Sequence, residues 1–263
     1  MFRQCVDNKN YYLGALVFLF FFVNEALAVC DCRSTIPNDL RLEKLCHGTS
    51  YTQYEKEIGE AFHKDKVLFE QLFKLHIAKY SNTSGSIINF KNSPKKVYRS
   101  AILSENLALL SELVKKRGVK TIVVLTNSKI FNIIPLINKE RDFFTVLGGK
   151  QFNHILDFHC DFDFNNKDEV ELAEGKVVAI INLIANTDGN VLIHCLGGEH
   201  RSEVVFEVMQ RCINKLDMNN IIERYKCHTG WESKTNKGNY RQENIDFIRD
   251  FPCELLSNLV RVH

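Results

Sequence analysis

From residue 84 onward, short apolar runs alternate with longer segments that carry apolar residues at helical spacing. The short runs are typical of buried strands and occupy 86–90, 96–101, 119–126, 144–149, 152–158 and 190–195. The longer segments predict helices at 104–118, 128–140, 167–186 and 201–217, with a turn and a closing helix in 238–256. Strands that alternate with helices of this length indicate an α/β fold, with a mostly parallel central sheet of four to five strands flanked by helices.

The first 83 residues have a different pattern. Two basic residues precede an apolar run from Leu13 to Val23, and Ala26-Leu27-Ala28 follows as a small-x-small cleavage site. We therefore interpret 1–28 as a secretory signal peptide, because the apolar run is much shorter than the roughly 20 residues of a spanning helix. Residues 29–83 form a cysteine-containing lead-in and a helical extension, and 84–263 form the main domain.

The signal peptide predicts an exported protein, either periplasmic or secreted, with no stable membrane insertion after cleavage. Two alternatives keep the chain on a membrane. The N-terminus stays uncleaved as an anchor, or Cys30 is lipidated, since Leu27-Ala28-Val29-Cys30 loosely resembles a bacterial lipobox.

Composition narrows the classes of partner. The 263 residues carry a net charge of only +2 and no dense run of Lys or Arg, so we expect no nucleic-acid partner. A small or local anion is the expected ligand.

The nine cysteines lie at 5, 30, 32, 46, 160, 195, 212, 227 and 253. An oxidising compartment favours disulfides, and the N-terminal group of three can bridge to any of the later cysteines except one kept free for chemistry. No His/Cys cluster with metal-ligand spacing lies near Cys30-x-Cys32, so we expect no metal and no other cofactor.

Residues 191–202 read VLIHCLGGEHRS and carry the most specific chemistry in the chain. Gly197 and Gly198 let the backbone turn with its N–H groups inward, and the helix that starts at Arg201 directs its positive end to the same place. The Arg201 guanidinium adds two donors suited to phosphate. In such surroundings Cys195 is expected to be a thiolate and a nucleophile.

The residues His194 to Ser202 match H-C-x-x-G-x-x-R-S/T, and the chain here resembles the cysteine-dependent protein tyrosine phosphatases. The stretch KVYRSAILSENLALLSELVKKRGVKTIVVLT is similar to atypical dual-specificity members, so the likeness spans roughly 88–215. The resemblance implies that Cys195 attacks phosphorus, that Arg201 holds the phosphate oxygens, and that His194 and Ser202 tune the thiolate. The phosphate-binding loop would comprise Leu196, Gly197, Gly198, Glu199, His200 and Arg201.

The resemblance also implies a general acid about thirty residues before the cysteine. Asp163 fits this distance best, and Asp161 is the alternative general acid. Cys160 lies in the same segment and is a candidate partner for oxidised Cys195.

These observations predict a protein tyrosine or dual-specificity type phosphatase that hydrolyses phosphate monoesters through a thiophosphate on the cysteine. The expected substrate is a phosphorylated protein, with phosphotyrosine or phosphoserine/threonine, or a small phosphomonoester. Inositol phosphates or phosphoinositides are the alternative, although Glu199 places a negative charge where a polyphosphate would bind.

Two alternatives of another class remain at this point. A catalytically weak phosphate-binding module would bind phosphate without turnover, and a thiol-redox or sulfur-transfer enzyme would also use a loop cysteine.

Elsewhere in the chain, residues 223–226 read as an exposed stretch of helix.

Overall fold

The computed structural model describes residues 67–68, 71, 83–126, 133–155, 158, 166–229 and 240–260. Five strands form one sheet in the order β1-β2-β5-β3-β4. Their bounds are Ser84–Asn89 (β1), Pro94–Ser100 (β2), Val119–Leu125 (β3), Gln151–Ile155 (β4) and Asn190–His194 (β5). Only β1 is antiparallel to its neighbour, so the predicted α/β fold with a mostly parallel sheet is confirmed.

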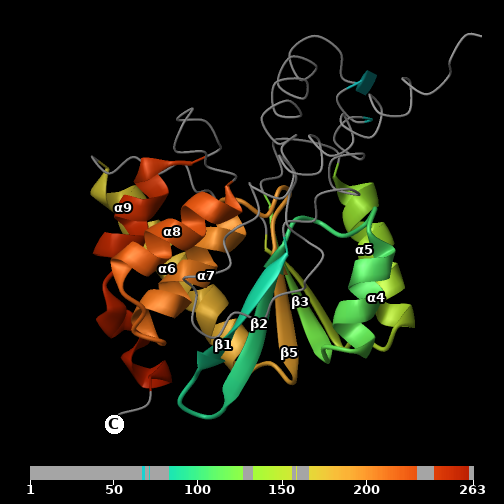
Figure 1. Ribbon diagram of the computed structural model, residues 1–263, viewed down its shortest axis with the longest axis horizontal. Helices are drawn as coiled ribbons and strands as arrows, with labels where there is room; N and C mark the ends of the chain where they lie inside the picture. Colours follow the sequence, from blue (N-terminus) through green and yellow to red (C-terminus); the bar gives the residue numbers. More distant parts are fainter. Residues whose placement is uncertain are drawn as a thin grey trace, which may run out of the picture.

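Helices cover both faces of this sheet (Figure 1). On one face lie α4 (Leu107–Lys115) and α5 (Ile134–Val146). The other face is covered by α6 (Lys167–Asn186), α7 (Arg201–Cys212), α8 (Met218–His228) and α9 (Gln242–Asp250), followed by the 3-10 helix η1 (Cys253–Leu259).

The alternation of side chains along the strands divides the core into two parts. Val123 and Ile193 belong to the cluster that contains residues of α6, α7 and α9. Ile122 and Leu192, one position earlier on the same strands, belong to the cluster that contains residues of α4 and α5. Buried strands of this kind read as continuous apolar runs, because each face packs against helices.

A buried lysine fixes the end of α6 against the sheet. Lys95, on β2, is only 7% exposed, and its ammonium group donates to the carbonyls of Ile184, Ala185 and Thr187 at 2.7, 3.1 and 2.5 Å. The last carbonyls of a helix have no partner within the helix, and a cation there also interacts favourably with the helix dipole. Lys95 therefore satisfies the C-terminus of α6 and ties it to β2.

One disulfide joins the end of α7 to η1, between Cys212 and Cys253. Cys212 and Cys253 are therefore not available as partners for the N-terminal cysteines. Among the described residues, no helix has the length and apolar character needed to cross a membrane.

The strand predicted at 144–149 is wrong in type. The predicted strand 144–149 is the last turn of α5 and the turn after it, where Gly148 has φ +87°. Phe144 is buried in line with Ile137 and Glu140, at helical spacing, whereas Val146 is 82% exposed. The β-branched residues Thr145 and Val146, followed by two glycines, favour a strand locally, but the packing of this segment selects a helix.

Three predicted helices differ in their bounds. The helix predicted at 104–118 spans Leu107–Lys115. Residues 128–132 of the helix predicted at 128–140 lie outside the described residues, and α5 starts at Ile134 and continues to Val146. The helix predicted at 201–217 ends at Cys212. The chain turns there through Lys215, which has φ +59°. By contrast, the helix predicted at 167–186 is confirmed with the same bounds.

Candidate active site

The loop 195–200 connects the end of β5 to the start of α7. β5 lies between β2 and β3 and is parallel to both, so the loop emerges at the carboxyl edge of the sheet, where ligands bind in open α/β folds. Cys195 is 5% exposed and is a free thiol. The structure therefore brings the cysteine, the glycines and the α7 N-terminus together as the sequence predicted.

The carbonyls of this loop are directed away from its centre by three contacts. The Leu196 carbonyl accepts from the Ile102 N–H at 3.2 Å, and the Gly198 carbonyl accepts from Arg99 Nη1 at 2.5 Å. The Cys195 carbonyl lies 3.2 Å from Nδ1 of His194. In a trans peptide the N–H points opposite to the C=O, so the N–H groups that follow these carbonyls face the other way, as an anion-binding loop requires.

Gly198 is required by the loop's close approach to β2. Its φ is +71°, in the left-handed region. A Cβ at this position would lie 2.4 Å from the backbone nitrogen of Ala101 and 2.5 Å from the carbonyl carbon of Ser100. Because these are backbone atoms, any side chain would displace the loop from the end of β2.

The surroundings of Cys195 favour its thiolate. Burial raises the pKa of the thiol, but the charge of Arg201 and hydrogen bonds from Ser202 and the His200 N–H outweigh it and hold the pKa of Cys195 below its ordinary value. The Ser202 hydroxyl itself lies 3.5 Å from the sulfur. Arg201 and Ser202 are the first two residues of α7, so one local turn supplies these groups.

His194 is completely buried behind the cysteine and contacts an acid that the sequence did not indicate. Its Nε2 lies 2.9 Å from Oε2 of Glu140, and both side chains have no exposed surface. Glu140 lies on α5, on the opposite face of the sheet from α7. A charged residue on the buried face of a predicted helix was the only available signal for it.

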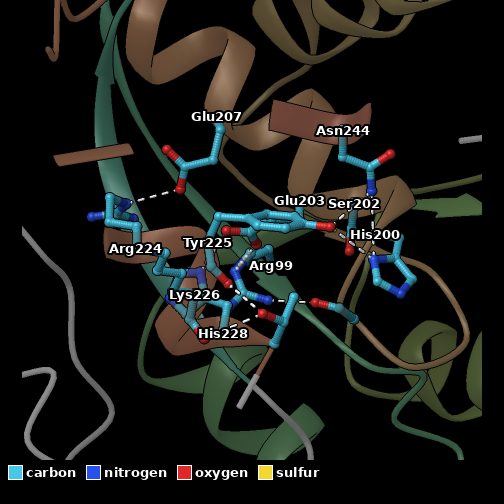
Figure 2. A network of polar contacts seen from close by, with 12 residues as sticks. Arg99, His200, Ser202, Glu203, Glu207, Arg224, Tyr225, Lys226, His228 and Asn244 are labelled. Atoms are coloured by element: carbon cyan, nitrogen blue, oxygen red, sulfur yellow. Dashed lines mark hydrogen bonds and ion pairs between the residues drawn. The ribbon is translucent and has the colours of Figure 1, made fainter. Parts of the chain in front are cut away.

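A buried ionic network lies beneath the loop, between β2, α7 and α8 (Figure 2). Arg99 pairs with Glu203 at 2.5 Å, and the other oxygen of Glu203 lies 2.6 Å from Nδ1 of His228. Arg224 pairs with Glu207 at 2.9 Å. All five side chains are at most 8% exposed. The network therefore connects the Gly198 carbonyl, through Arg99, to α8.

Three members of this network have the composition of a metal site. The ligand atoms of Glu203, Glu207 and His228 lie within 4.8 Å of one another. Each carboxylate, however, already pairs with a guanidinium group, from Arg99 or Arg224. Two guanidinium groups are therefore already the cationic partners of the acidic side chains in this buried cluster.

His200, in the loop, contacts a second polar group on α8. The Asn244 amide donates to the Tyr225 hydroxyl at 2.8 Å, and this leaves the hydroxyl hydrogen for Nδ1 of His200, 3.0 Å away (Figure 2). Tyr225 has no exposed surface. The structure therefore contradicts the prediction that 223–226 is an exposed stretch, because Arg224 is buried against α7 and Tyr225 is buried in contact with Asn244 of α9.

Glu199 is also enclosed rather than exposed. It is 6% accessible, and its carboxylate lies 3.6 to 3.9 Å from the position that a Cβ on Gly197 would take. The carboxyl group is thus part of the loop itself. Leu196 and Gly197 complete the loop between Cys195 and Gly198.

Several predicted features lie outside the described residues. These are both candidate acids, Asp163 and Asp161, the neighbouring Cys160, and the proposed signal peptide 1–28. Of the lead-in and helical extension 29–83, only four residues are described. The roles assigned to all of these stay predictions.

The sequence profile of the tyrosine phosphatase family matches residues 86–258, which is most of the chain and includes every element from β2 to α9. The chain belongs to the tyrosine phosphatase family. As a member of this family it is a cysteine-dependent phosphatase of the tyrosine or dual-specificity type. A comparison with curated proteins finds no match.

Three solved structures of phosphatases are similar to this family member. The core catalytic domain of the PP-IP phosphatase SIW14 from S. cerevisiae is 16% identical, with a TM-score of 0.43 over 61% of this chain and 83% of that one. TpbA from P. aeruginosa is 16% identical, with a TM-score of 0.42 over 62% and 85%. The PTP-2 phosphatase of Cydia pomonella is 16% identical, with a TM-score of 0.38 over 64% and 94%.

Proposed function

We propose that the chain is an exported phosphatase of the atypical dual-specificity type that removes phosphate from proteins. The observation that carries the chemistry is the free, buried Cys195 at the start of α7, with its thiol pKa lowered by Arg201, Ser202 and His200. A thiolate at the centre of inward N–H groups suits attack on a bound phosphate.

The reaction has two steps. The Cys195 sulfur attacks phosphorus and the bond from phosphorus to the leaving oxygen breaks, while Asp163 protonates that oxygen. Water then attacks the thiophosphate with Asp163 as base, and the sulfur leaves as a thiolate that accepts a hydrogen bond from Ser202. Arg201 and the loop N–H groups hold the phosphate oxygens throughout.

Protein substrates are favoured over inositol polyphosphates by the charge of the loop. Glu199 is enclosed within the loop, where its carboxylate repels a ligand that carries several phosphates on neighbouring positions. A phosphorylated side chain presents one phosphate and avoids this repulsion.

Hydrolysis of an aryl phosphate by the reduced, purified chain tests the chemistry. Cys195→Ser should abolish turnover, and Asp163→Asn should lower kcat by about 100-fold or more for a substrate with a poor leaving group. No activity of the wild-type chain would contradict the proposal. Undiminished activity of Asp163→Asn with a loss in Asp161→Asn would move the acid to Asp161.

The substrate class is tested on the same preparation. Phosphotyrosine and phosphoserine peptides are compared with an inositol polyphosphate, in the wild-type chain and in Glu199→Gln. We expect the peptides to have the higher kcat/KM in the wild-type chain, and the variant to gain mainly toward the inositol polyphosphate. Preference of the wild-type chain for the inositol polyphosphate would favour the alternative substrate class.

Export is supported by two independent features. The N-terminal pattern is that of a signal peptide, and the disulfide between Cys212 and Cys253 is of a kind that persists in oxidising compartments. N-terminal sequencing of the protein recovered from the producing cells tests this, with Val29 as the expected first residue. A product that retains Met1 would favour an uncleaved anchor, and one that starts with a lipid-modified Cys30 would favour lipidation.

A further inference from the structure

His194 has acceptors on both sides of its ring. Nδ1 lies 3.2 Å from the carbonyl oxygen of Cys195, and Nε2 lies 2.9 Å from a carboxylate oxygen of Glu140. A neutral imidazole has one N–H, whereas an imidazolium has two. Only the protonated ring can therefore donate toward both acceptors.

Glu140 is held in place from another part of the fold. Its Oε1 accepts a hydrogen bond from the N–H of Leu103 at 2.8 Å, while Oε2 faces His194. Its side chain has no exposed surface. A buried carboxylate costs free energy unless it is paired and hydrogen-bonded, and the Leu103 N–H and an imidazolium together provide this.

The other charged and titratable groups near the ring agree with a protonated His194. Burial lowers the pKa of His194, but the charge and contact of Glu140 and the Cys195 carbonyl outweigh it and raise the pKa above its ordinary value. His154, on β4, occupies the same row of the sheet, since both histidines pair with Val124 of β3. Burial and the charge of His194 lower the pKa of His154, which lies 2.6 Å from the Thr126 hydroxyl and stays neutral.

On the other side, Cys195 faces Arg201, and Arg99 beneath the loop is also within electrostatic reach of the sulfur. His194 thus adds a positive charge next to the cysteine from behind, where no solvent screens it.

We infer that Glu140 is a positioning residue of this active site, whose carboxylate keeps His194 protonated and pinned against the Cys195 carbonyl and so stabilises the thiolate. The inference rests on the proposed function only in taking Cys195 as the nucleophile. Glu140 acts through His194 and is not a catalytic residue.

The charge of Glu140 can be removed with little change in shape. In Glu140→Gln the amide oxygen can still accept from Leu103, and the amide N–H group can donate to a neutral Nε2. We expect the alkylation rate of Cys195 by iodoacetamide at about pH 6, followed by mass spectrometry of the Cys195 peptide, to fall by about tenfold. The rate well above the thiol pKa should equal that of the wild-type chain, and Glu140→Asp should recover part of the loss.

Glu105→Gln is the matched control. Glu105 pairs with Lys139, the residue before Glu140, at 3.1 Å on the surface, so this variant removes one carboxylate from the same region. Its alkylation profile should be that of the wild-type chain. In a His194→Gln background, Glu140→Gln should have no further effect, because the two residues act in series.

A measurement on the unmodified chain covers the case in which Glu140→Gln does not fold. The ring ¹⁵N shifts of His194 at neutral pH should be those of an imidazolium. A neutral ring, or an unchanged alkylation profile in folded Glu140→Gln, would overturn the inference. Alkylation does not need turnover, so a chain that shifts as expected but hydrolyses no phosphate would refute the proposed function and leave this inference intact.

Discussion

The carboxylate of Glu203 lies 2.5 Å from Nε of Arg99, and neither side chain has any exposed surface. The same guanidinium donates to the carbonyl of Gly198 in the cysteine loop. A buried ion pair of this kind is not by itself a source of stability, but removing one partner leaves the other charged and unpaired. The pair therefore links the stability of the fold to the shape of the loop.

Arg99→Met should lower the free energy of unfolding by about 3 to 5 kcal/mol, because the buried Glu203 carboxylate loses its guanidinium partner. Urea unfolding of the two chains measures this. Arg117→Met is the control, since Arg117 pairs with Glu112 at the surface, where both are 37% exposed, and should cost less than about 1 kcal/mol. Equal losses in the two variants would show that burial of the Arg99 pair is unimportant.

Gly198→Ala should lower kcat/KM by about 100-fold, because the added Cβ would lie 2.4 Å from a backbone atom of Ala101 and push the loop away from β2. Gly175→Ala, in the middle of α6 with open space around it, is the matched control. It should leave turnover unchanged and raise the free energy of unfolding by about 0.5 to 1 kcal/mol. Steady-state kinetics measure both effects. A Gly198→Ala chain with the kcat/KM of the wild type would contradict the close approach of the loop to β2.

In the proposed mechanism, Ser202→Ala should slow the second step more than the first, since the hydroxyl lies 3.5 Å from the Cys195 sulfur and would donate to the departing thiolate. Hydrogen bonds to charged groups contribute about 1.5 to 3 kcal/mol, so kcat should fall by roughly 10- to 100-fold. Stopped-flow measurements with an aryl phosphate should then reveal a burst of product.

Thr229→Val removes another buried hydroxyl, which donates to carbonyls of α8, and should show the kinetics of the wild-type chain. If Ser202→Ala loses activity without a burst of product, the slowed step is formation of the thiophosphate and not its hydrolysis.

Glu207 should make the fold less stable at alkaline pH. Burial, opposed by Arg224, raises the pKa of Glu207 from 4.5 to about 8 in the folded chain. Between these values the folded protein holds a proton that the unfolded chain releases, so stability falls as the pH rises from about 4.5 toward 8. Glu207→Gln should reduce the difference between urea midpoints at about pH 5.5 and about pH 8.

Glu171→Gln changes an exposed carboxylate on α6 and should leave that difference as it is in the wild-type chain. A Glu207→Gln chain with the same pH dependence as the wild type would assign the effect to another group of the network.

Local patterns were sufficient for much of the fold. The bounds of α6 follow from helical spacing that starts after Asn166, whose side chain accepts from the Glu169 N–H. The apolar run of β5 and the glycines after it likewise predicted the strand, the turn and the start of α7. Prediction failed where local preference and packing disagree, as at 144–149, because burial of Phe144 against the sheet selects a helix there.

The active-site loop itself was largely determined by the sequence. Cys195, Gly198, Arg201 and Ser202 lie within eight consecutive residues, so their spacing and the strand before them already define which groups meet. The tertiary structure decided what lies behind and beneath this loop. Arg99 meets Gly198 across 99 residues, Glu140 reaches His194 from the other face of the sheet, and Arg224 and Tyr225 are buried although their segment reads as polar. Whether a charged side chain is buried depends on which helix faces pack together, and that is a property of the whole fold and not of the neighbouring sequence.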